Sequence, residues 1–156
     1  MRKEQMMKSR FVALVLAVPL LLSCTSLSIF KKTISLKEVL IQKEEIDKSD
    51  NPAYKFLRIK DLSGKRVSVR GALVRDIIPS GNVDYEFCVI VRIPTEKGAV
   101  DCHVYSRDLD VIARLVSGTS RIDFTGDFGR FFTLLDDAYM KMELLNADVR
   151  ITGGSK

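Results

Sequence analysis

Apolar and polar residues alternate through most of the chain after residue 64, as β-strands with one buried face require. The alternation runs through 65–74, 85–93, 100–105, 122–128 and about 139–151. Gly71 interrupts the first of these segments, and a glycine inside a strand is typical of a bulge or of the sharp coiling that a small barrel needs. The pattern therefore predicts five strands, the first of them bent.

Residues 106–117 follow a different period, with apolar residues at helical spacing. These residues are Leu109, Ile112, Ala113 and Val116. Ser106 or Asp108 can cap the start of a helix, and Gly118 stands where a helix should stop. The predicted order is strand, strand, strand, helix, strand, strand, with a turn at 136–138 between the last two strands.

Two cysteines fall on the predicted hairpin formed by 85–93 and 100–105. A four-residue loop at 94–97 would pair Ile93 with Gly98 and Val89 with Cys102. Cys88 then lies on the more polar face and Cys102 on the apolar face. Side chains on opposite faces of a sheet cannot form a disulfide, so we expect two free thiols.

The region before the strands has a weaker pattern. Residues 35–60 are predicted to be helical or extended, with Leu36, Val39 and Leu40 on one face if they are helical. Asp50 or Asn51 can cap a second short helix that has Pro52 at its first position and ends near Lys60.

The first 24 residues have the layout of an export signal. A basic segment, 1–10, precedes a run of 12 apolar residues, 11–22, that is followed by Ser23 and Cys24. A run of 12 is too short to cross a bilayer core, which takes about 20 helical residues. We therefore expect a signal peptide over 1–23, a tether over 24–34 and a short tail over 153–156.

Leu21-Leu22-Ser23-Cys24 resembles the lipobox of bacterial lipoproteins. The resemblance implies that Cys24 becomes the new amino terminus, linked to diacylglycerol and carrying an N-acyl chain. Thr25 in place of Asp implies sorting to the outer membrane if the host is Gram-negative. The alternative is an ordinary signal peptide that contains a cysteine.

The net charge of +5 suggests nucleic-acid binding, but the positions of the charged residues along the chain weaken that interpretation. Residues 1–23 hold four Lys and Arg against one Glu, a net of +3, which leaves +2 for the rest. Most of the basicity would thus be removed with the leader.

The segments 64–71 and 123–126, with the apolar hairpin between them, resemble strand signatures of small envelope OB-fold proteins and of the anticodon-binding-like OB family. The resemblance spans roughly residues 60 to 151. It implies a mainly β fold, in which a five-stranded Greek-key barrel over 61–152 carries one helix between its third and fourth strands.

OB-folds bind ligands on the outer face of strands two and three and on two neighbouring loops. The candidate residues on that face are Glu86, Ile90, Arg92, Asp101, His103 and Tyr105. The loops offer Arg75, Asn82, Arg130, Phe131 and Phe132. Of these we predict ligand contacts from Arg92, His103, Tyr105, Arg130, Phe131 and Phe132.

The two adjacent phenylalanines need separate treatment, because neighbouring residues on a strand cannot both face the core. Either one of Phe131 and Phe132 is exposed as a contact for a partner, or a bulge at Gly129 buries both.

The chain contains no G-x-S-x-G, Walker loop, H-E-x-x-H or Cys-x-x-Cys motif. A single histidine, His103, is weak evidence for a base or a metal ligand, and Asp136 and Asp137 lack the spacing of a calcium loop. We expect no enzyme, no metal and no cofactor besides the lipid on Cys24.

The sequence therefore predicts a membrane-anchored binding module of the bacterial envelope, with a protein or glycan partner. The alternative is an OB-fold that binds single-stranded nucleic acid, which the single clear aromatic and the two carboxylates of the face disfavour. A third possibility is an enzyme built around His103, which would need a metal or a cleft beside the histidine.

Overall fold

The computed structural model describes residues 31–96, 98–134 and 139–154. Its elements in chain order are β1 (Thr33–Ser35), α2 (Leu36–Lys48), α3 (Pro52–Ser63), β2 (Arg66–Pro79), β3 (Phe87–Thr95), β4 (Gly98–Val104), α4 (Leu109–Ile112), β5 (Arg121–Leu134) and β6 (Tyr139–Gly153).

Five of the strands close into a barrel in the order β2-β3-β4-β6-β5, with β5 pairing back onto β2. All these pairs are antiparallel except β4 with β6, which is parallel. A single short helix, α4, lies between the third and fourth barrel strands. This is the OB-fold-like barrel that the strand pattern predicts.

Strand β2 bends so that it can belong to two ladders. Its first part, up to Leu73, pairs with β5, and its last part, from Val74, pairs with β3. The bend lies at Gly71, which has a φ of 62° beside a register shift between Val69 and Ala72. The Asp123 carboxylate accepts a hydrogen bond of 2.7 Å from the amide of Gly71. The predicted interruption at Gly71 is confirmed as a bulge.

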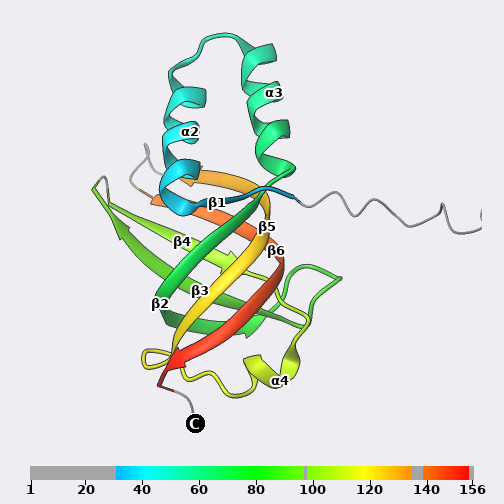
Figure 1. Ribbon diagram of the computed structural model, residues 1–156, viewed down its shortest axis with the longest axis vertical. Coiled ribbons are helices and arrows are strands. Elements are labelled where there is room, and N and C mark those ends of the chain that lie inside the picture. Colours follow the sequence, from blue (N-terminus) through cyan, green and yellow to red (C-terminus); the bar gives the residue numbers. More distant parts are fainter. Residues whose placement is uncertain (1–30, 97, 135–138, 155–156) are drawn as a thin grey trace, which may run out of the picture. The chain divides into compact units, whose positions relative to one another are not determined.

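A helical hairpin stands at one end of the barrel and α4 lies at the other (Figure 1). The side chain of Ser35 caps α2 through a capping box with Glu38. The side chain of Asn51 caps α3, and Pro52 takes its first position as predicted. Of the two structures predicted for 35–60, the helical one is correct.

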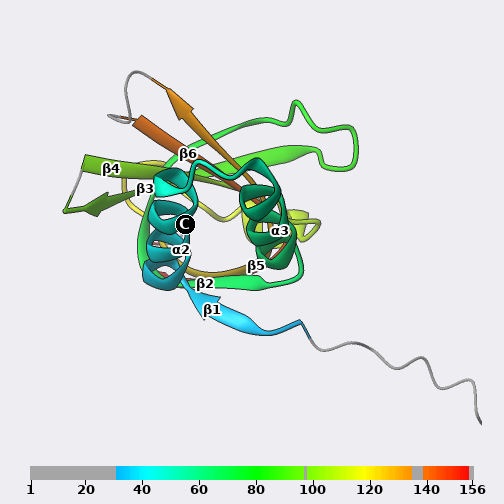
Figure 2. The same ribbon diagram turned by 90° about the horizontal axis from the view of Figure 1, so that it is seen from above.

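The hairpin contributes to the barrel core and does not stand free of it. Val39 of α2 and Leu62 of α3 are fully buried in the same cluster as Val67, Phe124 and Leu144. Seen from above, the two helices lie side by side over the barrel end (Figure 2). Ser35 and the two residues before it form β1, parallel to the start of β2, where we had expected the tether to continue through residue 34.

The predicted helix over 106–117 is wrong beyond its first turn. Helix α4 ends at Ile112, and Leu109 and Ala113 are exposed, whereas Ile112 and Leu115 are buried. The reason lies in competing hydrogen bonds. The Gly118 amide donates to the Val74 carbonyl at 2.8 Å, and the Ser120 hydroxyl accepts from the Val116 amide at 2.8 Å. The first bond docks the segment onto β2, and the second closes a turn within the segment, so the helix does not continue.

The predicted hairpin register is wrong by two residues. Strands β3 and β4 pair Thr95 with Gly98 and Val91 with Cys102, so the strands continue past the loop we had placed at 94–97. A shift of two leaves every side chain on its predicted face, because the period of a strand is two. Cys88 and Cys102 accordingly lie on opposite faces and are free, as predicted. Both are buried, although we had placed Cys88 on the more polar face.

Several predictions fall outside the described residues: the signal peptide, the lipobox with Cys24, the turn at 136–138 and the end of the tail. Within the described ranges, none of the helices combines the length and the apolar character needed to cross a bilayer.

We expect Gly71→Ala to lower the free energy of unfolding by about 1–2 kcal/mol, because a Cβ is strained at this positive φ. Gly81→Ala is the matched control, since neither position has an atom near the added Cβ and only Gly71 has a positive φ. Urea unfolding of both variants measures the difference. Equal stabilities would show that the bend does not depend on glycine.

Candidate ligand-binding face

Register places two transverse rows of side chains on the outside of the barrel. The first row crosses β3, β4, β6 and β5 through Ile90, His103, Glu143 and Arg130. The second row, two residues along each of the four strands, runs through Arg92, Asp101, Lys141 and Phe132. Arg75 joins them from β2, where it is the extra residue of a bulge between Val74 and Asp76. We call these nine residues the outer face.

One buried carboxylate organises one side of the outer face. Asp101 is 1% exposed and accepts a two-pronged hydrogen bond from Arg92, at 2.7 and 2.9 Å. Arg75 donates to the same carboxylate at 2.7 Å. The two arginine side chains themselves are half exposed, at 50% for Arg75 and 47% for Arg92. A carboxylate with bidentate geometry fixes the direction of a guanidinium, so Arg92 is held in a fixed orientation, whereas Arg75 is tethered by a single charge-assisted hydrogen bond.

A second carboxylate organises the other side. Glu143 is 8% exposed, accepts from Arg130 at 2.6 Å and contacts the Lys141 ammonium at 3.1 Å. Desolvation opposes the charge of Glu143, but the hydrogen bonds from Arg130 and Lys141 outweigh it and hold the pKa of this carboxyl below its ordinary value. The Arg130 guanidinium also lies 4.4 Å from the ring centre of Phe132.

The outer face therefore has an excess of positive charge. Arg75, Arg92, Arg130 and Lys141 outnumber Asp101 and Glu143, and both carboxylates are buried beneath their partners. The side chains of Arg75, Arg92 and Arg130 are half exposed or more, and each is paired with a buried carboxylate. Guanidinium groups held in this way are suited to recognise an acidic group.

His103 lies between the two carboxylates and contacts Cys88, whose sulfur is 3.5 Å from Nδ1. Burial lowers the pKa of His103, and the nearby Lys141 ammonium adds to the effect. Burial also raises the pKa of the Cys88 thiol to about 11. A thiol with that pKa stays protonated at neutral pH, so this Cys–His contact does not supply an ionised nucleophile.

The structure separates the six predicted contact residues. Arg92, His103, Arg130 and Phe132 come together on the outer face. Tyr105 does not reach the ligand side: it is 6% exposed and packs on Tyr85, with ring centres 5.4 Å apart. Phe131 turns inward against Phe128, at 4.7 Å, so only Phe132 of the adjacent pair is a surface contact.

Two residues of the face, Lys141 and Glu143, were missed at the level of sequence. They belong to the fifth barrel strand, which pairs with β4 across forty positions of chain. The alternation of that strand marks their side chains as outward, but only the parallel pairing of β6 with β4 brings them beside Asp101 and His103. The other predicted face residue, Glu86, stays in the loop before β3.

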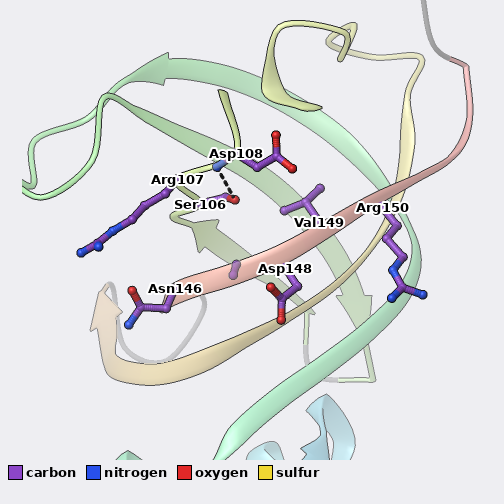
Figure 3. Close-up of a pocket in the computed structure, with 8 residues that line it drawn as sticks. Ser106, Arg107, Asp108, Asn146, Asp148, Val149 and Arg150 are labelled. Atoms are coloured by element: carbon purple, nitrogen blue, oxygen red, sulfur yellow. Dashed lines mark hydrogen bonds between the residues drawn. The ribbon is translucent and has the colours of Figure 1, made fainter. Parts of the chain in front are cut away.

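A hollow of about 460 Å³ lies between the chain after β4 and the middle of β6 (Figure 3). Its polar residues already serve the fold. Asp108 caps α4, Asp148 pairs with Arg66 at 2.8 Å, and Asn146, at a φ of 47°, is bound to Tyr85 and Asp127. We therefore assign this hollow a structural role at the bend of β6.

The described part of the chain gathers no group of three or more His, Cys, Asp or Glu side chains suited to a metal ion. The sequence matches no known protein family model and no curated relative.

His103 is the only histidine, so its ring protons can be followed directly by NMR. We expect it to titrate below 6.5, so protonation favours the unfolded chain and the free energy of unfolding falls as the pH drops below about 6.5. Lys141→Gln should raise the pKa and Glu143→Gln should lower it further, because the two side chains shift it in opposite directions. A pKa that does not respond to either change would contradict the placement of His103 between them.

Proposed function

We propose that the chain is a lipoprotein of the bacterial cell envelope, anchored through Cys24, whose OB-fold-like barrel is a non-catalytic binding module for a protein or glycan partner. The partner presents acidic groups to the outer face. In a Gram-negative host, the membrane is the outer membrane. The observation that carries the proposal is the set of arginines that two buried carboxylates hold in place.

The chemistry of the face favours a ligand over a purely structural role. Exposed surface ion pairs contribute little to stability, with a median near 0–1 kcal/mol. Here the carboxylates are buried and the three arginines stay half exposed or more, so the pairs hold guanidinium groups at the surface. Fixed arginine donors recognise carboxylates and phosphates because less side-chain entropy is lost on binding.

The same face fits single-stranded nucleic acid less well. Such ligands bind through several stacked bases, each worth about 1–3 kcal/mol. Phe132 is the one aromatic side chain of the outer face, and the cations of Arg130 and Lys141 lie over it. Without a row of stacking rings, the face matches scattered acidic groups on a protein or glycan better than a strand of bases.

We expect the double variant Arg75→Gln/Arg130→Gln to weaken binding of a uronic-acid oligosaccharide or an acidic peptide by at least about tenfold, since two charge-assisted hydrogen bonds are lost. Each carboxylate keeps one cation, because Arg92 remains on Asp101 and Lys141 remains on Glu143. Fluorescence anisotropy with labelled ligands measures the affinities.

Arg70→Gln/Arg114→Gln is the matched control, as it removes the same charge from exposed positions away from the face. An equal loss in the control would reduce the effect to net charge and contradict the assigned face. Tighter and steeply salt-dependent binding of a labelled oligo-dT, with neither acidic ligand bound, would replace the proposal with the nucleic-acid alternative.

A further inference from the structure

Helix α3 carries an apolar stripe that faces solvent. Ala53, Phe56, Leu57 and Lys60 follow the spacing that places residues on one side of a helix, and all four are exposed. Phe56 is 66% exposed and Leu57 is 62% exposed, the largest values among the apolar side chains of the helical hairpin. A stripe of exposed aromatic and leucine side chains that is bordered by a lysine is typical of helices that lie at a membrane surface.

The helical hairpin and the barrel also differ in net charge. Residues 31–66, which hold the helical hairpin, contain ten Lys and Arg against six Asp and Glu, a net charge of +4. Residues 67–156, which hold the barrel, contain eleven against thirteen, a net charge of −2. The hairpin region is thus attracted to an anionic lipid surface, whereas the barrel is weakly repelled.

The chain enters the fold at the root of this hairpin. The carbonyl of Lys32 accepts a hydrogen bond of 3.0 Å from the amide of Arg66, just after α3. Cys24 precedes Thr33 by nine residues, which span at most about 30 Å when extended. Helix α3 is about 18 Å long. A lipid on Cys24 therefore keeps the bilayer within reach of the hairpin.

We propose that the stripe formed by Ala53, Phe56, Leu57 and Lys60 rests in the headgroup region of the bilayer that holds Cys24. The contact rests on the lipid anchor of the proposed function. It makes the outer side of α3 the part of the described structure that contacts the membrane, whereas α4 lies at the opposite end of the barrel from the helical hairpin (Figure 1).

A bilayer fits this stripe better than a second copy of the chain does. Two large exposed side chains offer roughly 300 Å², against about 800 Å² per partner in a stable interface. At a membrane the same small area is enough for a stable contact, because the lipid on Cys24 already holds the protein there. The contact of the stripe with the bilayer then forms within an anchored complex. Lys60 extends its ammonium towards the headgroups while its methylene stem stays with the apolar residues.

The chain has no tryptophan, so Phe56→Trp gives a single fluorescent reporter in the full-length protein expressed in a bacterial host. The purified protein is reconstituted into phosphatidylethanolamine/phosphatidylglycerol vesicles with brominated acyl chains. We expect a blue-shifted emission and loss of most of its intensity relative to unbrominated vesicles. Val83→Trp, at a fully exposed position in the loop before β3, is the control and should keep its intensity.

The intact mass of the same preparation reports the anchor separately. A lipidated protein whose Phe56→Trp emission is not quenched by brominated lipid overturns the inference and leaves the proposed function standing. A blue shift without such quenching also overturns it and indicates a protein contact. A preparation without lipid on Cys24 removes the anchor and the inference with it, since the stripe alone is too small to hold the membrane.

Discussion

The fold depends on the bend of a single strand. Strand β2 can close the barrel only because its first part pairs with β5 and its last part with β3. Gly71 permits the change of direction through its positive φ, and two side chains of β5 bind its backbone: Asp123 accepts from its amide and Arg121 donates to its carbonyl. Once the strand is bent, a second bulge places Arg75 outside the barrel beside Asp101.

The outer face follows from this closure. Buried carboxylates are costly unless they are paired, and removing one partner from a buried pair is strongly destabilising. Asp101 and Glu143 each pair with at least two cations, so each would retain a pair if one cation turned to a ligand. Under the proposed function, an acidic group could therefore compete for Arg75 or Arg130 without leaving a buried charge alone.

The parts of the structure with a strict local period could be predicted from the sequence. The alternation of apolar residues predicted the barrel strands, Gly71 predicted the bulge, and Asn51 with Pro52 predicted the start of α3. The length of α4 could not be predicted, because the Gly118 amide donates to the distant Val74 carbonyl and the Val116 amide donates to the Ser120 hydroxyl instead of to a helical carbonyl. The register of the β3–β4 hairpin was also predicted wrongly, by two residues. Each side chain nevertheless lies on its predicted face of the sheet, because a strand has a period of two residues.

The candidate site was predictable only in part, because some of its residues come together through contacts between distant parts of the chain. Arg92 and His103 lie on strands whose outward positions the alternation marks. Arg130 was expected in a loop, but it lies on β5, where the register shift between Phe128 and Arg130 turns its side chain outward. Their neighbours Lys141 and Glu143 come from a strand that joins β4 through a parallel pairing across forty residues, and no local pattern encodes that contact. Tyr105 was misjudged because Tyr85, from the loop before β3, packs on it. Phe131 was misjudged because the register shift between Phe128 and Arg130 turns it inward.

We propose that this barrel works on a membrane surface, and the intact mass of the protein made in a bacterial host is the decisive measurement. We expect a mature chain that begins at Cys24, carries diacylglycerol and partitions into detergent, and a Cys24→Ala variant that lacks the lipid. A full-length product without lipid would contradict it. That chain would keep its net charge of +5, and nucleic acid would become the leading candidate ligand.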